Sequence, residues 1–451
     1  MCGIAGFIDF SRQTSAAALK ATVSQMASTL RHRGPDDAGV WTDAEAGIAL
    51  GHQRLSIIDL SPTGHQPMVS PDGRYVIVYN GEAYNFPELR RELEACERRF
   101  RGRSDTEVIL HGCAEWGVAA TVNRLVGMFA FALWDRDTRT LSLVRDRMGI
   151  KPIYWGWSQN TFLFGSELKA LRAHPDWSAA LDRNALAAFV RFNYIPAPHS
   201  IYQNIQKLAP GQILTLRPNG EHEIDTYWST RRVAYTGLTE RLDIGPGEAI
   251  DQLETLLRQA VGCRMVSDVP LGALLSGGID SSTIVALMQI QSNRPIKTFS
   301  IGFDEADYDE AQHAKAVAKH LGTDHSELYV GPDHARDVIP RLASMYDEPF
   351  ADSSQIPTFL VSELARQEVT VALSGDGGDE LFGGYPRYYH ADHRRRVIEL
   401  LPRIAREGLG WCLKRMPARF FDRVDDVLST VSAGKISPGR ATRAYLAGGN
   451  G

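Results

Sequence analysis

Cys2 is the residue whose type and position could do the most chemistry. If Met1 is removed, Cys2 carries both a thiol and a free α-amine. An α-amine has an unperturbed pKa of about 7.7–8.0, so near neutral pH it can accept the thiol proton. The pair is then a nucleophile with its own general base, like a Thr paired with an N-terminal amine. Gly3 and Gly6 leave room for backbone to approach this residue closely.

A Cys that attacks an amide also needs an oxyanion hole. Asn80 and Gly81 follow an expected strand over residues 75–79. The Asn80 side-chain amide and the Gly81 backbone N–H could donate to the developing oxyanion. A simpler alternative for this dipeptide is a type I′ hairpin turn.

Three charged residues could bind an amino-acid substrate. Arg54 could hold an α-carboxylate through two parallel hydrogen bonds. Glu82 and Asp105 could bind the ammonium group. Ser104–Glu107 also has the pattern of a helix N-cap, which does not exclude a binding role for Asp105.

The second half contains a glycine-rich loop of the kind that cradles phosphate. The expected strand 271–275 leads into Ser276-Gly277-Gly278 and then an expected helix over 283–291. The glycines let backbone approach an anion, Ser276 and Ser281 supply hydroxyls, and the helix N–H groups face the phosphate. Because Asp280 would repel phosphate, a bridging Mg²⁺ is its expected partner.

A second acidic loop, Ser374–Glu380, follows the expected strand 369–373. Two loops at the carboxyl ends of parallel strands would face one crevice, where open α/β sheets bind ligands. One such loop alone could be a plain strand-to-helix turn. The full run Ser276–Ser282 after a buried strand is much more specific.

The elements that position these residues change character along the chain. In the first half, short strands separated by turn signals favour hairpins and an antiparallel core. In the second half, strands alternate with helices, which predicts a doubly wound parallel sheet. We expect domains at residues 2–217 and 248–451, joined by a linker over 218–247 that is rich in glycine near its end. The expected strands are 3–9, 47–50, 75–79, 129–135, 141–145, 161–166, 212–217, 271–275, 296–303, 325–330 and 369–373. The expected helices are 16–31, 86–96, 106–116, 283–291, 309–321, 335–346 and 357–367.

Composition narrows the class of protein. The 451 residues are 43% hydrophobic and 23% charged, with a net charge of -5. This favours a globular protein and gives no support for nucleic-acid or membrane binding. The five cysteines are scattered without CxxC spacing, so neither a disulfide framework nor a zinc site is expected. No signal peptide is recognised, and we expect a cytoplasmic protein.

The first half resembles the class II glutamine amidotransferase domain. The resemblance rests on residues 2–7, 31–36, 51–59, 79–82, 102–107, 146–152 and 164–170. It implies an α+β N-terminal-nucleophile hydrolase fold of αββα layers that releases ammonia from glutamine through a thioester. It also implies Cys2 as nucleophile and Asn80 and Gly81 as oxyanion hole. The implied glutamine-binding residues are Arg54, Leu55, Ser56, Ile57, Ile58, Asn80, Gly81, Glu82 and Asp105.

The second half resembles the PP-loop of ATP pyrophosphatases, which cleave ATP between the α and β phosphates. The resemblance implies that Asp280 and Asp379 hold Mg²⁺ and that residues 347–354 lie near the aspartate and ATP phosphates. The implied ATP-binding residues are Leu275, Ser276, Gly277, Gly278, Asp280, Ser281, Ser282, Ile301, Ser374 and Gly375.

Together the halves resemble the glutamine-hydrolysing asparagine synthetase family. The resemblance implies that aspartate and ATP form β-aspartyl-AMP, which ammonia, channelled between the domains, converts to asparagine. Glutamine, aspartate and ATP are the expected small-molecule partners, and a homodimer is possible. Asp376 stands where many members have a Glu that deprotonates ammonia.

The end of the sequence departs from the family pattern. Members continue through a segment that holds an Asp-Arg pair, a Ser-Met pair and a Lys, and this segment is not recognised after Tyr389. We therefore expect the second domain to be incomplete at its C-terminal end. The alternatives are a truncated or divergent member with glutaminase activity only, or an amide ligase with a different acceptor.

Overall fold

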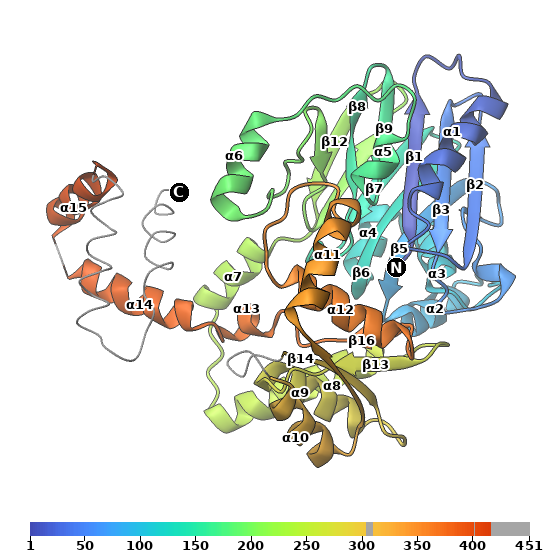
Figure 1. Ribbon diagram of the computed structural model, residues 1–451. Coiled ribbons are helices and arrows are strands. Elements are labelled where there is room, and N and C mark those ends of the chain that lie inside the picture. The colour runs from blue at the N-terminus through green and yellow to red at the C-terminus, as the bar shows by residue number, and fades with distance from the viewer. Residues whose placement is uncertain (304–309, 401, 416–451) are drawn as a thin grey trace. The chain divides into compact units, whose positions relative to one another are not determined.

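The computed structural model describes residues 1–303, 310–400 and 402–415. It contains two compact units, Met1–Gly375 and Asp376–Gly451. The first unit holds two antiparallel sheets and one parallel sheet (Figure 1). In the described part of the second unit the elements are α13 (Gly378–Phe382), α14 (Pro386–Glu399) and α15 (Arg403–Arg415).

The two antiparallel sheets have six strands each. The first has the order β10 (Ile205–Lys207), β8 (Tyr154–Ser158), β9 (Thr161–Gly165), β1 (Gly3–Asp9), β3 (Ile48–Arg54), β2 (Asp37–Asp43). The second has the order β12 (His222–Thr226), β11 (Gln212–Leu216), β7 (Thr140–Arg145), β6 (Gly127–Asp135), β5 (Tyr75–Ala83), β4 (Met68–Val69).

The two antiparallel sheets face each other across a shared core. Because side chains alternate along a strand, every second residue of each strand points into this core. In β1, Ile4 and Ile8 join the core between the sheets, while Phe7 joins the core on the outer face. In β5, Val76 and Val78 point inward in the same way. Even-numbered residues of both strands therefore face the space between the sheets.

Helices cover the outer face of each antiparallel sheet (Figure 1). The helices α1 (Ala16–Ser28), α5 (Leu168–Arg172) and α6 (Arg183–Phe192) contribute to the core outside the first sheet. The helices α2 (Phe86–Ala95), α3 (Asp105–Trp116) and α4 (Val118–Arg124) contribute to the core outside the second. These αββα layers confirm the predicted N-terminal-nucleophile hydrolase fold.

The parallel sheet has the order β15 (Asp324–Val330), β14 (Lys297–Phe303), β13 (Leu271–Leu274), β16 (Val371–Leu373). One core joins it to α8 (Pro246–Arg264), α9 (Ile279–Gln289) and α10 (Ala311–Leu321). Separate clusters join it to α11 (Pro332–Met345) and α12 (Gln355–Arg366). Helices on both faces confirm the predicted doubly wound sheet. The remaining elements are η1 (Pro62–Gly64) and α7 (Thr230–Thr239).

Several expected elements have different bounds, and two of them bear on the sites. The helix predicted over 283–291 begins at Ile279, because Gly277 has a φ of +81° and turns the chain directly into the helix after Gly278. The strand predicted to end at Tyr79 continues to Ala83. The segment 218–247, which was predicted to be a linker, contains β12 and α7. The domain boundaries at residues 217 and 248 stay predictions.

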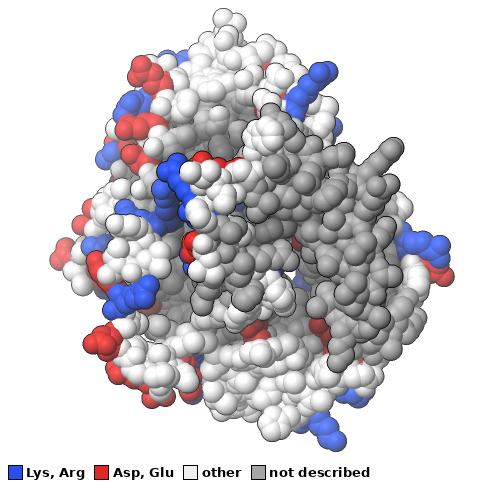
Figure 2. All heavy atoms as spheres, turned by 90° about the vertical axis from the view of Figure 1, so that its left-hand side faces the viewer, with Lys and Arg blue, Asp and Glu red and all other residues white. Residues whose placement is uncertain are grey.

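The described surface carries charges of both signs. Figure 2 shows Lys and Arg side chains interspersed with Asp and Glu side chains among the residues drawn in colour. No helix in the described ranges combines the length and the apolar character that crossing a membrane requires.

Candidate active site

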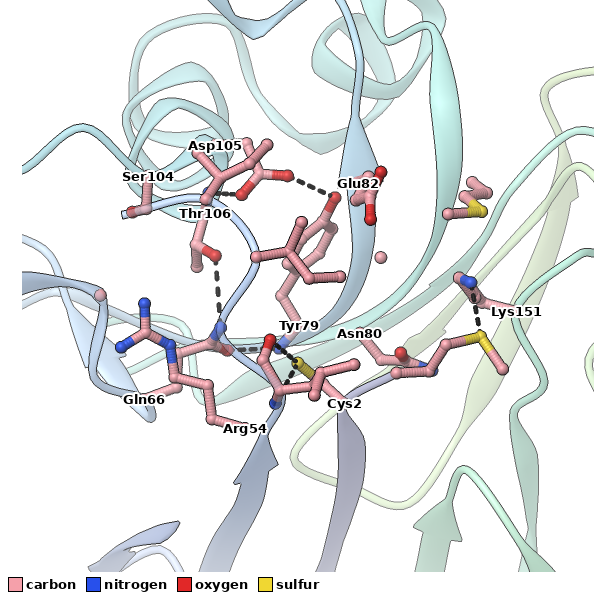
Figure 3. Close-up of a pocket in the computed structure, with 17 residues that line it drawn as sticks. Cys2, Arg54, Gln66, Tyr79, Asn80, Glu82, Ser104, Asp105, Thr106 and Lys151 are labelled. Carbon is pink, nitrogen blue, oxygen red and sulfur yellow. Dashed lines mark hydrogen bonds between the residues drawn. The ribbon is translucent and has the colours of Figure 1, made fainter. Parts of the chain in front are cut away.

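A pocket between the two antiparallel sheets gathers the residues predicted for glutamine binding (Figure 3). Alternation along three strands explains this. Cys2 continues the inward-facing series of β1, Arg54 that of β3, and Asn80 and Glu82 that of β5. The lining residues are Met1, Cys2, Arg54, Leu55, Ile57, Ile58, Gly64, Gln66, Tyr79, Asn80, Gly81, Glu82, Ser104, Asp105, Thr106, Met128 and Lys151. Of the predicted set only Ser56 is not among them. Its N–H donates to Asp36 at 2.8 Å.

The Cys2 thiol lies against the backbone of Leu55. Its Sγ accepts from the Leu55 N–H at 3.4 Å and lies 3.6 Å from the Leu55 carbonyl oxygen. Burial raises the pKa of this thiol, so it needs a base to become a thiolate. The Met1 α-amine is in the same pocket, and burial lowers its pKa to about 5.

Asn80 carries the most informative polar groups of the pocket. Its side chain is fully buried, and neither its Nδ2 nor its Oδ1 has a hydrogen-bond partner among the described residues. A buried amide without partners costs free energy, so such groups in native proteins call for an explanation. Groups kept ready for a ligand are one such explanation.

The hairpin-turn alternative for Asn80-Gly81 is wrong. Both residues lie inside β5, where Asn80 is opposite Ala130 and Gly81 is opposite Phe129 in β6. The strand continues because the residues after Tyr79 still pair in register with β6. The pairing aims the Asn80 side chain inward instead of exposing it at a turn.

Gly81 is required by the close approach of β6. A Cβ on Gly81 would lie 2.3 Å from the Met128 carbonyl oxygen and 2.7 Å from the Phe129 Cα. We expect Gly81→Ala to lower the free energy of unfolding by about 1–3 kcal/mol, because backbone must move. Gly237→Ala is the matched control, because Gly237 lies in α7 and no atom lies within 4 Å of the position that a Cβ would take. There the change should be neutral or stabilising. Urea unfolding measures both, and equal stabilities of Gly81→Ala and the unsubstituted chain would contradict the expectation.

Arg54 and Asp105 are both held by backbone groups. The Arg54 guanidinium donates to the carbonyls of Asp59 and Ser61. Asp105 begins α3 after Ser104, whose side chain accepts from the Glu107 N–H, so the predicted N-cap is confirmed. Both side chains line the pocket. Both Asp105 carboxylate oxygens accept hydrogen bonds, Oδ1 from the Thr106 N–H and Oδ2 from Tyr79 Oη and the Ala83 N–H.

The carboxylates of the pocket are unusually basic. Burial and the neighbouring Asp105 raise the pKa of Glu82 to about 7. Burial also raises the pKa of Asp105, although it accepts from Tyr79 Oη at 3.0 Å and from the Ala83 N–H at 2.9 Å. Two close buried carboxylates favour a cationic group between them.

Sequence reasoning missed a buried cation in this pocket. The Lys151 side chain is 2% exposed, and its Nζ lies 2.7 Å from Met1 Sδ. Burial lowers the pKa of Lys151 to about 8. The run Ile150-Lys151-Pro152 was recognised only as part of a motif, and no feature of its spacing indicates that the ammonium faces Cys2's pocket. In the view of Figure 3, Cys2 lies between Arg54 on one side and Asn80 and Lys151 on the other.

The phosphate-type loop lies at the carboxyl end of β13. Ser276 Oγ lies 2.9 Å from Ser281 Oγ, and Ser281 Oγ also accepts from the Ser276 N–H at 3.2 Å. Asp280, Ser281 and Ser282 belong to the first turn of α9 rather than to the loop in which they were predicted. The Ser282 Oγ is buried without a partner among the described residues.

The strand order brings the second loop beside the first. From β13 the sheet runs through β14 to β15 on one side, and β16 lies on the other, so the order reverses between β13 and β16. Ligands of open α/β sheets bind at such a reversal. Gly375, after β16, packs so closely that a Cβ would lie 2.7 Å from the Ser281 nitrogen. Within the first unit, Gly375 thus lies against the start of α9.

The other residues predicted to bind ATP lie in hydrophobic clusters or at the end of the first unit. The Leu275 side chain is buried, and its backbone N–H and carbonyl are hydrogen-bonded to Phe299 and Ser300 of β14. Ile301 packs against the cluster formed by Val330, Val338 and Leu360. Ser374 precedes Gly375, and both end the first unit, while Asp376 and Asp379 belong to the second.

The donor set around the first loop fits Mg²⁺. The described residues include no group of three or more His, Cys, Asp or Glu side chains arranged for a metal. Mg²⁺ is usually held by one or two carboxylates together with substrate phosphates, so it does not require such a group. Asp280, half-buried in the first turn of α9, is a suitable single carboxylate. The roles of all these residues stay predictions.

An inward-facing Cys beside an unpartnered Asn, in αββα layers followed by a doubly wound sheet, defines a glutamine amidotransferase joined to a nucleotide-binding synthetase half. Family models agree. The model described as "Glutamine amidotransferase domain" matches residues 1–228, and the one described as "Asparagine synthase" matches residues 252–434.

Curated relatives cover most of the chain. A putative glutamine-hydrolysing asparagine synthetase 2 of Methanocaldococcus jannaschii is 38% identical over 425 residues, which is 90% of this chain and 79% of the relative. Asparagine synthetase 1 of Bacillus subtilis is 36% identical, with 86% of this chain and 59% of the relative covered. The chain belongs to the glutamine-hydrolysing asparagine synthetase family, whose members use ATP. The predicted family is therefore confirmed.

A likeness to a solved structure is weaker. The glutamine phosphoribosylpyrophosphate amidotransferase of B. subtilis, complexed with ADP and GMP, has a TM-score of 0.39 and 14% identity. The match covers 73% of this chain and 81% of that one.

Proposed function

We propose that this chain makes L-asparagine from L-aspartate and ATP, with ammonia released from L-glutamine. The observation that carries the proposal is the buried, unpartnered Asn80 amide in the same pocket as the Cys2 thiol. The products are glutamate, AMP, pyrophosphate and asparagine. Family membership and the close approach of Gly375 to Ser281, where the strand order of the parallel sheet reverses, support the ATP-dependent half.

In the glutaminase half, Cys2 attacks the side-chain carbonyl of glutamine. Once Met1 is removed, the Cys2 α-amine takes the thiol proton and later gives it to the leaving ammonia. Asn80 and Gly81 donate to the oxyanion, and Arg54, Glu82 and Asp105 bind the α-carboxylate and α-ammonium. Leu55, Ile57 and Ile58 line the pocket. Water then hydrolyses the thioester to glutamate and regenerates the thiol.

In the synthetase half, an aspartate β-carboxylate oxygen attacks the α-phosphorus of ATP and pyrophosphate leaves. Residues 275–278, 280–282, Ile301 and 374–375 bind ATP in this proposal. Mg²⁺, held by Asp280 and Asp379, supplies charge neutralisation for the phosphates. Ammonia passes through a channel between the halves and attacks the acyl carbon of β-aspartyl-AMP. It loses a proton to Asp376, and AMP leaves as the acyl C–O bond breaks. A cytoplasmic homodimer is the proposed state of the protein.

Joint measurement of three products tests this proposal. The purified chain is incubated with ATP, Mg²⁺ and aspartate, and with either glutamine or ammonia. Asparagine and pyrophosphate in equal amounts, with glutamate formed when glutamine is present, are the expected result. Glutamate without pyrophosphate would contradict asparagine synthesis and identify a chain with glutaminase activity only.

Glu82→Gln should weaken glutamine binding. If Glu82 binds the α-ammonium, losing its charge should raise the KM for glutamine by about tenfold to a hundredfold, as expected for a buried charge-assisted hydrogen bond. Because the pKa of Glu82 is about 7, the carboxylate is lost as pH falls through that value, and KM should rise below it. Both the effect of the substitution and the effect of pH are measured through glutamate formation from pH 5.5 to 8.5. This range extends roughly 1.5 units on either side of the pKa. If the KM of Glu82→Gln depends on pH in the same way as the KM of the unsubstituted chain, Glu82 does not bind the α-ammonium group.

Gly277→Ala should impair the ATP half alone. Gly277 has a φ of +81°, and a Cβ there would lie 2.6 Å from the Ala314 nitrogen. We expect pyrophosphate formation to fall about tenfold or more, because the loop that orients the phosphates must shift. Gly278→Ala is the comparison, since only Ser276 Oγ lies near its Cβ position, at 3.3 Å, and its loss should be smaller. Unchanged glutaminase activity in both variants is expected, and a parallel loss of that activity would indicate general misfolding instead.

A further inference from the structure

A row of charged side chains links the backbone of Cys2 to the second half of the chain. Arg33 Nε donates to the Cys2 carbonyl at 2.9 Å, and Arg33 Nη1 lies 2.7 Å from Glu167 Oε1. Lys169 Nζ lies 2.6 Å from Glu167 Oε2 and 3.3 Å from Asp347 Oδ1. Asp347 Oδ2 also accepts from the Lys169 N–H at 2.9 Å. Cations and carboxylates therefore alternate from the nucleophile to Asp347.

The members of this row are largely buried. The exposed fractions of the side chains are 10% for Arg33, 14% for Glu167, 21% for Lys169 and 9% for Asp347. Burial alone would raise the pKa of Glu167, but hydrogen bonds from His32, Lys169 and Arg33 lower it to about 2. Glu167 is thus a carboxylate at any pH at which the protein works, and it is shared between Arg33 and Lys169.

Glu167 directly follows a residue that is hydrogen-bonded to the start of β1. Its neighbour Ser166 accepts from the Ile4 N–H at 3.0 Å and donates its own N–H to the Ile4 carbonyl at 2.9 Å. Strand pairing of β1 begins only at Gly3, so Cys2 has no partner in the sheet. Arg33 supplies the contact at Cys2, and its Nη2 is buried without a partner among the described residues. Arg33 is therefore oriented through Nε and Nη1 alone.

The other end of the row belongs to a segment that is fastened to the first half. Glu348 forms an ion pair with Lys207 and accepts from the Ile201 N–H at 3.3 Å. The Ala351 N–H donates to the Asn193 carbonyl at 2.9 Å. This is the segment, 347–354, that the sequence predicts near the aspartate and ATP phosphates.

We propose that Glu167 is a positioning residue for the glutaminase step. It holds Arg33 against the Cys2 carbonyl and is itself held by Lys169, which Asp347 contacts in turn. A change at Asp347, outside the glutamine pocket, then disturbs the nucleophile. The inference rests on the proposed function, because it concerns the orientation of Cys2 during glutamine hydrolysis.

Three variants and their combination test the row: Glu167→Gln, Lys169→Met, Asp347→Asn and the double variant Glu167→Gln/Asp347→Asn. With glutamine alone, we expect kcat to fall about tenfold in Glu167→Gln and about threefold in each of the other two single variants. KM should stay within about twofold, because the row orients the nucleophile and does not bind glutamine. The double variant should be no slower than Glu167→Gln, because residues of one network are not additive.

Asp135→Asn is the matched control. Asp135 is also 14% exposed and pairs with Arg74 at 2.7 Å, away from the pocket. It should lose thermal stability as Glu167→Gln does, but keep its kcat. If Glu167→Gln keeps its kcat, if the double variant shows the product of the single losses, or if Asp135→Asn loses as much kcat, the proposal is overturned. An unsubstituted chain that forms no glutamate would overturn the proposed function and this inference together, whereas the other outcomes affect only the inference.

Discussion

Cys2→Ala should abolish glutamine-dependent asparagine formation and leave ammonia-dependent formation unchanged. Loss of a nucleophile typically lowers kcat by at least about a thousandfold. The ATP half should be unaffected, because its glycine loops follow β13 and β16, whereas Cys2 precedes β1 in another sheet. Asparagine is measured with glutamine and with ammonium chloride as separate nitrogen sources.

Cys96→Ala is the control for this substitution, since Cys96 is an exposed free cysteine outside the pocket. It should behave as the unsubstituted chain with both nitrogen sources. N-terminal sequencing of the active protein should begin at Cys2, because the general base in this mechanism is the Cys2 α-amine. Full glutaminase activity in a chain that still begins with Met1 would contradict that mechanism.

The sequence predicted most of the pocket's lining because these residues stand in motifs that resemble those of the glutamine amidotransferase domain. What it did not predict is how they come together. The strands expected over 47–50 and 75–79 end before Arg54 and Asn80, while β3 and β5 include both residues. Once the strands are that long, alternation alone aims both side chains between the sheets. The length of β5 was missed because the Asn-Gly pair inside it is typical of a turn, and pairing with β6 outweighs that local preference.

Lys151 and the row through Glu167 could not be predicted for a different reason. Both depend on contacts between residues far apart in the chain, Lys151 with Met1 and Lys169 with Asp347. The periodic pattern of apolar and polar residues along a sequence does not indicate contacts between distant residues. The expected parallel sheet was correct, since alternating strands and helices leave few alternatives. Its bounds were less accurate at α9, where the positive φ of Gly277 starts the helix early.

Asn80→Ala should reduce activity strongly without reducing stability. Removing one donor of an oxyanion hole lowers kcat by about a hundredfold to a thousandfold. Most buried substitutions also destabilise, but here the amide has no partner among the described residues to lose. The folded state is relieved of a buried unsatisfied group, whose cost is about 1–3 kcal/mol. The small cavity left by Ala acts in the opposite direction, so the free energy of unfolding should be unchanged or higher.

Asn85→Ala separates this effect from a general effect of losing an Asn. The Asn85 side chain donates to the Arg124 carbonyl at 2.9 Å and accepts from the Val126 N–H at 2.8 Å, and it does not line the pocket. It should therefore lose stability and keep its glutaminase kcat, the reverse of Asn80→Ala. Glutaminase kinetics and urea unfolding of the two variants measure this crossed pattern. A large loss of stability in Asn80→Ala would mean that the amide serves the fold, and its place in the oxyanion hole would then have to be given up. The crossed pattern would instead mean that the fold keeps an unsatisfied amide beside Cys2 because the reaction uses it.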